Sequence, residues 1–229
     1  MRIGICVCAM LAVFSAQAIQ VAESLLVDLD VADLTLSDNE YVSSWQNDGS
    51  VGGVYSNLVA GKGPRYQTSV GGVPAVTFQA YDPSSVMTNM TPVPASICGT
   101  DTWSFETWVF NPSLTQTEIV FSWTARNKWP GAATGSCVEF RYGGDTGNAV
   151  EHYGNNVSWS GAAPAVGMWH HVACTRDAEG REKLYLDGQL RTLTTPILMQ
   201  VRQDGVFCLG SVRDYAQTNT TTGAWNSPF

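Results

Sequence analysis

Positive charge is scarce in this 229-residue chain. It has 12 Lys and Arg residues against 20 Asp and Glu residues, a formal net charge of −8, and its basic residues form no cluster. Proteins that bind nucleic acids or anionic membranes neutralise phosphates with clustered cationic side chains. The composition therefore excludes nucleic acid as the expected partner.

Long hydrophobic runs are missing after residue 20, because polar or turn residues interrupt every later apolar stretch. At the N-terminus, Arg2 precedes an apolar run over 3–14, and small residues follow at Ala16 and Ala18. A membrane span needs roughly 20 apolar residues, whereas this shorter run has the layout of a secretory signal peptide. We expect residues 1–18 to be removed and the mature chain to be secreted or at the cell surface, without membrane insertion.

Helical periodicity is also missing, since no apolar residues recur at i, i+3, i+4 and i+7 over any sustained stretch. Charged residues make up 14% of the chain and glycine contributes 22 residues, a composition typical of short strands joined by tight turns. With no linker visible, we expect one all-β domain over 19–214. The segment 215–229 is polar and predicts an irregular end, so either the chain is truncated before a last strand or the fold closes differently.

Alternating apolar and polar residues predict a series of strands. They are expected at 24–31, 41–46, 73–79, 103–111, 117–123, 136–142, 168–176, 181–187, 190–194 and 206–210. The clearest unit is 168–194, where turn residues at 177–180 and the pair Asp187-Gly188 connect three alternating runs. Asp-Gly is a strong hairpin signal because glycine adopts the positive φ of the turn. This segment predicts a three-stranded antiparallel meander.

Several motifs follow one another in the order found in a known family. They are LLVDLD at 25–30, W-x-N-x-G at 45–49, GVPAVTF at 72–78, WSFETWVFNPS at 103–113, EIVFSW at 118–123, GMWHHVACTRD at 167–177 and LYLDG at 184–188. In this order the chain resembles the laminin G-like, concanavalin A-like jelly roll of exported bacterial surface proteins, and the last two strands are similar to those of pentraxins. The resemblance implies a two-sheet antiparallel jelly-roll sandwich that recognises carbohydrate or surface proteins beside its concave sheet, in some members with Ca²⁺.

Zinc-type cysteine patterns are absent: the chain has no Cys-x-x-Cys pair, and no His stands at ligand spacing beside a cysteine. Processing would leave Cys98, Cys137, Cys174 and Cys208. An even number of cysteines in an exported chain is compatible with two disulfides, with three pairings open. Buried thiols on strands are the alternative.

Paired carboxylates are the candidates for catalysis, because glycoside hydrolysis needs two carboxyl groups about 5 to 9.5 Å apart. The resemblance implies that hydrolases on this fold carry a Glu-x-Asp-x-x-Glu run on a central strand, and this run is absent here. Asp28 with Asp30, which share one face of the expected strand, and Glu106 with Glu139 remain as pairs. The structural interpretation makes the aspartates a solvent face and gives Glu139 a salt-bridge partner such as Arg141.

Nucleophilic catalysis has no support in the sequence, since no Ser/His/Asp or Cys/His arrangement can be assigned. His170 and His171 occupy consecutive positions of an expected strand and therefore point to opposite faces. They cannot bind one metal ion together, and we assign them to packing and hydrogen bonding between the sheets.

The segment 126–161 mixes aromatic rings with amide and carboxylate groups in expected loops. Sugars stack their C–H faces on aromatic rings while such polar groups bind their hydroxyls, and exposed aromatics often mark contacts. The predicted ligand-binding residues are Trp129, Tyr142, His152, Tyr153, Asn155 and Trp159. The alternative for several of them is the core, since tryptophan is generally well buried.

The same segment could instead bind Ca²⁺, because Asp145, Asn148 and Glu151 carry the oxygen ligands that this ion takes. They have no defined calcium-loop spacing, so a solvated acidic loop is the simpler interpretation. No other cofactor is expected.

These observations predict an exported, non-catalytic module that binds a glycan or a cell-surface polymer through loops at one side of the sandwich. Two other classes of function stay open. One is a glycoside hydrolase or lyase on the same fold. The other is a structural or adhesive domain of a larger envelope protein.

Overall fold

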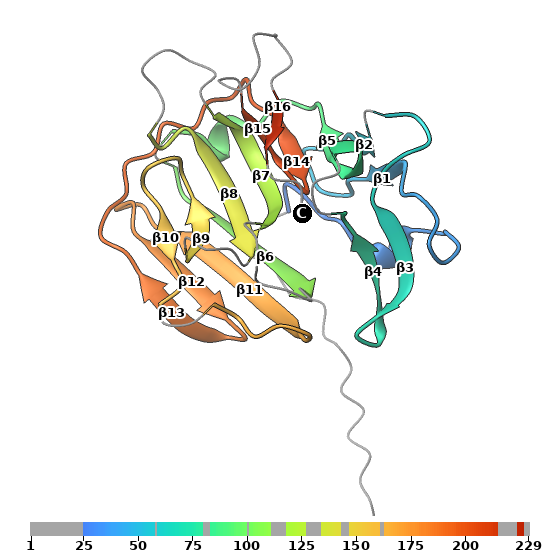
Figure 1. Ribbon diagram of the computed structural model, residues 1–229. Helices are drawn as coiled ribbons and strands as arrows, with labels where there is room; N and C mark the ends of the chain where they lie inside the picture. The colour runs from blue at the N-terminus through green and yellow to red at the C-terminus, as the bar shows by residue number, and fades with distance from the viewer. Residues whose placement is uncertain are drawn as a thin grey trace, which may run out of the picture.

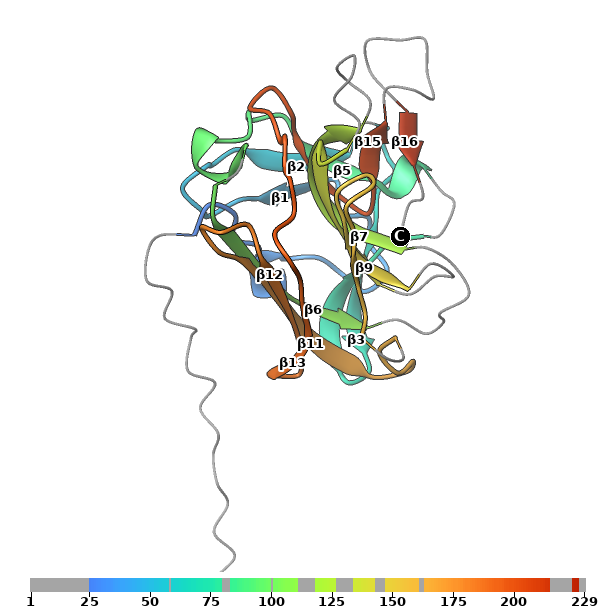
Figure 2. The same ribbon diagram turned by 90° about the vertical axis from the view of Figure 1, so that its left-hand side faces the viewer.

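The protein, in a computed structural model, is a sandwich of two sheets with a two-stranded hairpin beside it (Figures 1 and 2). In the segments that the structure describes, no helix is long and apolar enough to cross a membrane. The described residues are 25–57, 59–79, 83–99, 101–110, 118–126, 134–142, 147–160, 163–214 and 224–226. The expected signal peptide and Trp129 lie outside them.

The larger sheet contains ten strands, and its hydrogen-bonded path runs β1-β2-β5-β14-β7-β8-β9-β10. These strands are β1 (Ser44–Gln46), β2 (Val54–Asn57), β5 (Met87–Asn89), β14 (Phe207–Leu209), β7 (Glu118–Arg126), β8 (Cys137–Tyr142), β9 (Asn148–Glu151) and β10 (Val157–Ser158). Off this path, β15 (Val212–Asp214) runs parallel to β7 and antiparallel to β16 (Ala224–Asn226). Neither β15 nor β16 was among the predicted strands, the last of which ended at residue 210.

The smaller sheet has the order β13-β12-β11-β6, formed by β6 (Trp103–Phe110), β11 (Trp169–Arg176), β12 (Glu182–Leu186) and β13 (Gln189–Leu193). Strands β11, β12 and β13 are the predicted antiparallel meander. Asp187 and Gly188 form its second turn with φ values of 51° and 76°. The meander is confirmed, and β6 joins it by pairing with β11 along its whole length.

Strand alternation builds the core between the two sheets. In β11 every second residue is buried, and in β8 the side chains of Val138, Phe140 and Tyr142 belong to the hydrophobic core. The rings of Phe105 and Phe121, one from each sheet, meet edge to face at 4.9 Å, a favourable aromatic geometry. These contacts close the sandwich that the family resemblance implies.

The two-stranded hairpin consists of β3 (Arg65–Val70) and β4 (Val73–Thr77). Its turn lies against the end of the smaller sheet, where Trp169 Nε1 donates a hydrogen bond of 2.8 Å to the Val70 carbonyl. A Cβ on Gly71 would lie 2.8 Å from the ring of Phe110, so only glycine allows this close approach. The hairpin therefore covers one end of β6 and β11.

Residues 24–31 were predicted as a strand, which was wrong for 25–30, where the structure shows an irregular segment. The side chain of Asn47 bonds it instead: Oδ1 accepts from the Asp28 N–H at 2.8 Å, and Nδ2 donates to the Leu26 carbonyl at 3.2 Å. A 3₁₀ turn, η1 (Val31–Asp33), follows and is capped by Asp30. Two further 3₁₀ turns, η2 (Pro83–Ser85) and η3 (Ala95–Ile97), precede β6. The Asn of the W-x-N-x-G motif, Asn47, thus anchors the irregular segment 25–30 to the strand β1 region.

The cysteines Cys98, Cys137, Cys174 and Cys208 are all buried thiols, with no disulfide between them. Burial raises the pKa of Cys98 to about 11, and nearby Asp101 and Asp204 add to the effect. Its Sγ donates to the Pro94 carbonyl at 3.2 Å. The structure therefore has the buried-thiol arrangement rather than the two disulfides that the cysteine count allowed.

Candidate functional site

Three of the predicted ligand-binding residues lie in the core. Tyr142 and His152 have no exposed surface and Trp159 is 5% exposed. Tyr142 points inward because it shares the strand parity of Val138 and Phe140, and Trp159 packs edge-on against its ring at 6.5 Å. This corrects their predicted stacking role: aromatic density in the sequence reflected packing.

His152 belongs to a buried chain of hydrogen bonds. Its Nδ1 lies 3.1 Å from the Cys137 carbonyl oxygen, and its Nε2 lies 2.9 Å from Glu182 Oε2. Glu182 Oε1 accepts from Arg176 Nη1 at 3.1 Å, and Arg176 Nη2 donates to the Ile197 carbonyl at 2.7 Å. The network pairs the buried charges of Glu182 and Arg176 and fixes the segment after β13, so His152 positions the rim of the sandwich.

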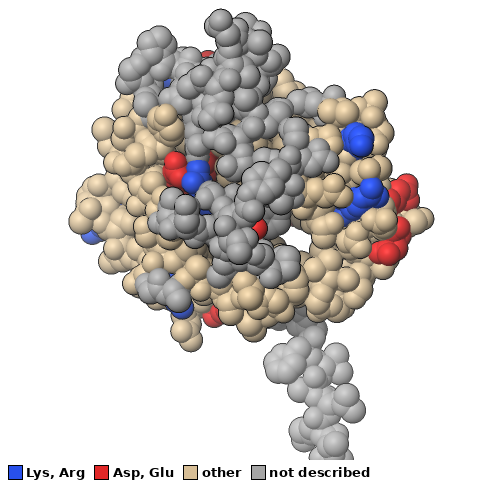
Figure 3. All heavy atoms as spheres, in the orientation of Figure 1, with Lys and Arg blue, Asp and Glu red and all other residues tan. Residues whose placement is uncertain are grey.

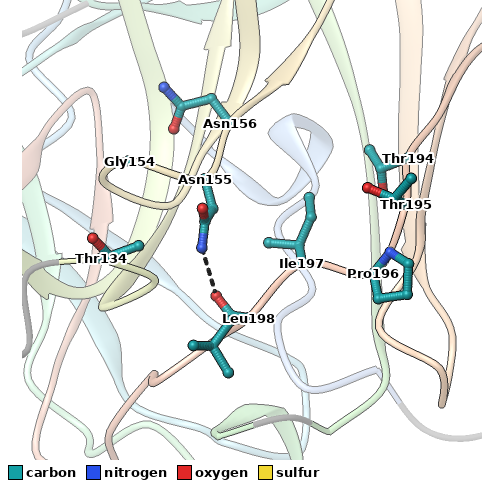
Figure 4. A pocket seen from close by; sticks show the side chains of 9 residues that line it. All are labelled: Thr134, Gly154, Asn155, Asn156, Thr194, Thr195, Pro196, Ile197 and Leu198. Atoms are coloured by element: carbon teal, nitrogen blue, oxygen red, sulfur yellow. Dashed lines mark hydrogen bonds between the residues drawn. The ribbon is translucent and has the colours of Figure 1, made fainter.

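A hollow of about 640 Å³ lies at this rim, between the loop after β9 and the segment after β13. Its volume falls in the range of small-molecule sites. Figure 4 shows Thr134 on one side, Ile197 in the middle, and Thr194 and Thr195 on the other side. The lining consists of Thr134, Gly154, Asn155, Asn156, Thr194, Thr195, Pro196, Ile197 and Leu198.

Backbone hydrogen bonds hold the walls of this rim hollow in place. Gly135 N–H donates to the His152 carbonyl at 2.6 Å, and Ile197 N–H donates to the Gly180 carbonyl at 2.8 Å. The Asn155 amide joins the two walls by donating from Nδ2 to the Leu198 carbonyl at 3.1 Å. These hydrogen bonds fix both walls, so the hollow is formed without a ligand.

The chemistry of the lining is polar and uncharged. Its amides and hydroxyls match sugar hydroxyls, and Pro196 and Leu198 present exposed apolar surface of the kind that a sugar C–H face contacts. None of the residues lining the hollow is ionisable, so it offers no general acid or base. Of the predicted residues, Asn155 lines the hollow, whereas the half-buried Tyr153, two positions earlier in the chain, does not.

The two carboxylate pairs considered for hydrolysis are not supported as catalytic pairs. Asp30 caps η1 by accepting from the Ala32 N–H at 2.9 Å, and the Asp28 backbone is held by Asn47. Glu106 and Glu139 each neighbour an inward phenylalanine, so their side chains point away from the core between the sheets, on opposite sides of the sandwich, although Glu139 is itself buried. Sheets pack about 10 Å apart, which puts these carboxylates beyond the roughly 9.5 Å limit of a catalytic pair.

Glu139 forms an ion pair with Arg141, the partner expected from the sequence, at 2.9 Å between Oε2 and Nη2. Arg141 Nη1 also lies 2.5 Å from Glu151 Oε2, and Cys137 Sγ donates to Glu139 Oε1 at 2.9 Å. One guanidinium thus bridges two carboxylates on neighbouring strands. The arrangement is that of a buried structural cluster.

The calcium hypothesis gains no support in the described segments, where no three His, Cys, Asp or Glu side chains are grouped to hold a metal ion. Glu151 is paired with Arg141, and Asn148 Oδ1 accepts from the Ser158 hydroxyl at 3.1 Å. Asp145 lies outside the described residues.

His170 and His171 point to opposite faces, as predicted. The buried His170 has Nδ1 2.8 Å from Asp187 Oδ2 and Nε2 3.1 Å from the Ala165 carbonyl oxygen. Partial burial alone would raise the pKa of Asp187, but hydrogen bonds from His170 and the His171 N–H outweigh it and lower that pKa. His170 therefore ties the hairpin turn to the sheet, while His171 lies on the outer face.

Sequence reasoning missed Trp108, which is 63% exposed on the outer face of the smaller sheet. The signal was available, because Trp108 has the opposite strand parity from the buried Trp103 and Val109. Figure 3 shows the opposite side of the molecule, where charged side chains gather at the right, on the side of the hairpin β3–β4, and in a smaller group at the left.

Comparisons with solved structures find several β proteins of low identity. A heptameric SAP-like pentraxin from Limulus polyphemus is 12% identical with a TM-score of 0.42, covering 62% of this chain and 65% of the pentraxin. Domain 4 of AbnA, an extracellular arabinanase from Geobacillus stearothermophilus, in complex with arabinotriose, is 18% identical with a TM-score of 0.46, covering 84% and 88%. The alginate lyase AlgAT5 is 15% identical with a TM-score of 0.33, covering 88% and 87%.

Among curated protein sequences none matches the chain. A family model described as the concanavalin A-like lectin/glucanases superfamily, of laminin G-like type, matches residues 84–225, which is more than half of the chain. This span contains both sheets of the sandwich apart from β1, β2 and the last residue of β16. The chain belongs to the concanavalin A-like lectin/glucanases superfamily.

Proposed function

We propose that the protein is an exported, non-catalytic module that binds a neutral glycan in the rim hollow. The observation that carries the proposal is the lining itself, which combines amide and hydroxyl groups with apolar surface and contains no ionisable side chain. Sites of this kind orient a ligand with a few polar groups on a largely preformed surface. The signal-peptide pattern over 1–18 supports export.

Residues that face the hollow test the proposal. Thr195→Val keeps the shape of an exposed side chain and removes its hydroxyl, and Asn155→Ala removes the amide that joins the two walls. We expect each variant to bind its best neutral oligosaccharide about fivefold or more weakly, since a lost hydrogen bond typically costs about 1 kcal/mol. A glycan array selects the ligand for the mature chain, and isothermal titration measures the affinity.

Met90→Ala is the matched control, because Met90 is 59% exposed and does not line the hollow. Wild-type protein that binds no neutral glycan on the array, or hollow variants that bind as tightly as wild type, would contradict the proposal. Release of reducing ends or unsaturated sugars from a bound polysaccharide would favour the hydrolase or lyase alternative.

A further inference from the structure

Trp108 has the highest exposed fraction of the large apolar side chains in the described part of the chain. Its value is 63%, whereas Trp45, Trp103, Trp123 and Trp159 are each 9% exposed or less. Leaving an indole in water forgoes about 25 cal/mol for each Å² that burial would remove. A solvent-facing tryptophan on a regular strand therefore presents a large apolar surface of the residue type that most often dominates binding contacts.

The Trp108 ring is held in place by a neighbour. His171 stands directly opposite on β11, and the two ring centroids are 5.2 Å apart at an interplanar angle of 51°. His171 Nε2 lies 3.4 Å from Glu106 Oε2, and Glu106 is two residues from Trp108 on the same face. The Trp108 ring thus packs against the His171 imidazole, whose Nε2 is buried, and lies beside a carboxylate able to accept hydrogen bonds. The contact with His171 limits the motion of the ring, which lowers the entropy cost of binding.

The rest of this face has a small residue between two larger ones. Across three strands the register pairs Glu106 with Ala173, and Ala173 with Tyr185. Neighbouring strands lie about 4.8 Å apart, so the backbones carrying Glu106 and Tyr185 are about 10 Å apart with only a methyl group between them. That spacing admits a sugar ring.

We propose that this outer face of the smaller sheet is a second ligand site, where a neutral glycan stacks on Trp108 and hydrogen-bonds to the exposed Glu106 carboxylate. Pyranose rings have an apolar C–H face for the indole and hydroxyls at the edge for the carboxylate. Polyanionic glycans are disfavoured by Glu106 and by the net charge of −8. The ligand class rests on the proposed function, whereas the residues are separate from those of the rim hollow.

The two sites lie toward opposite ends of β11. His171 adjoins Trp108, and Arg176 holds the Ile197 carbonyl at the hollow. Five residues of strand separate them, which corresponds to about 17 Å. One glycan chain that reached both sites would gain avidity, so we expect polymers to bind more tightly than oligosaccharides.

Affinity electrophoresis of the mature chain tests the inference, with xyloglucan, galactomannan or mixed-linkage β-glucan in the gel and alginate as the polyanion. We expect Trp108→Ala to bind the best neutral polymer about tenfold or more weakly, because buried tryptophan contacts dominate many interfaces. Met90→Ala, a control of similar exposure, should match wild type. Glu106→Gln keeps its hydrogen-bonding groups and should stay within about threefold, whereas a cationic ligand would lose far more.

Several results would overturn the inference: equal retardation of wild type and Trp108→Ala, retardation by alginate alone, or a wild-type dimer that Trp108→Ala converts to monomer in sedimentation. The last result would make the face a contact between copies. If Thr195→Val weakens binding and Trp108→Ala does not, the proposed function stands and the second site falls. The reverse pattern would leave the second site and remove the rim hollow as the binding site.

Discussion

At the scale of single residues, strand parity decides which tryptophans meet solvent. Trp103 and Trp108 lie on the same strand five positions apart, so their side chains point to opposite faces, and they are 8% and 63% exposed. Aromatic density, which directed the sequence-based site prediction to 126–161, carries no such information. Parity on β6, combined with the inward Phe105, would have identified Trp108.

Trp159 provides a test at this scale. We expect Trp159→Ala to lower the free energy of unfolding by about 3–5 kcal/mol, because it leaves a cavity in the core. Trp159→Phe should lower the free energy of unfolding much less. The buried Nε1 has no hydrogen-bond partner in the structure, so its removal leaves no other polar group unpaired. Urea unfolding followed by circular dichroism measures both. A Trp159→Ala protein of unchanged stability that no longer binds glycan would restore the predicted stacking role.

At the scale of secondary-structure elements, the Asp187-Gly188 turn joins β12 and β13 and also anchors β11. Asp187 accepts from the His171 backbone N–H at 3.0 Å and lies 2.8 Å from His170 Nδ1. These bonds lower the pKa of Asp187 despite its partial burial. The turn thus depends on the ionised carboxylate.

The lowered pKa of Asp187 in the folded protein determines how stability changes as the pH falls. The contribution of Asp187 to stability is fully present above its ordinary value, near pH 4, and is lost as the pH falls through the lowered pKa. We expect Asp187→Asn, which also accepts a positive φ, to show a smaller loss of stability than wild type between pH 6 and pH 3. Thermal unfolding across this range measures it, with the exposed Asp33→Asn as a control for net charge. If the melting temperatures of wild type and Asp187→Asn fell equally between pH 6 and pH 3, the ionised Asp187 would not stabilise the turn.

Elements differ in how well the sequence predicts them. Strands β6, β8, β11 and β12 were predicted to within one residue at each end, because six or more alternating residues or clear turn signals mark them. Strands β2, β9, β10 and β15 have two to four residues, which is too few to show a period. The rim hollow could not be predicted for another reason. Its walls at 154–156 and 194–198 are about 40 residues apart in the sequence and come together only in the fold.

At the scale of the whole molecule, stability comes from sheet packing rather than covalent links. Because Cys98, Cys137, Cys174 and Cys208 are buried thiols, we expect dithiothreitol to leave the melting temperature of the protein unchanged. Iodoacetamide should modify none of them in native protein at neutral pH, since the thiolate is the reactive form, and all four after unfolding. Intact mass measures both states. A lower melting temperature under reductant would point instead to disulfides.

The pairing of β6 with β11 has a consequence for how the chain is made. These strands are the longest antiparallel pair of the smaller sheet, yet about 60 residues of sequence separate them. At about 5–20 residues per second, β6 leaves the ribosome several seconds before its partner exists. During synthesis the inward side of β6, with Trp103, Phe105 and Val109, therefore has no partner strand until β11 follows. The meander, whose contacts are local, can form first and offer β11 as the edge onto which β6 docks.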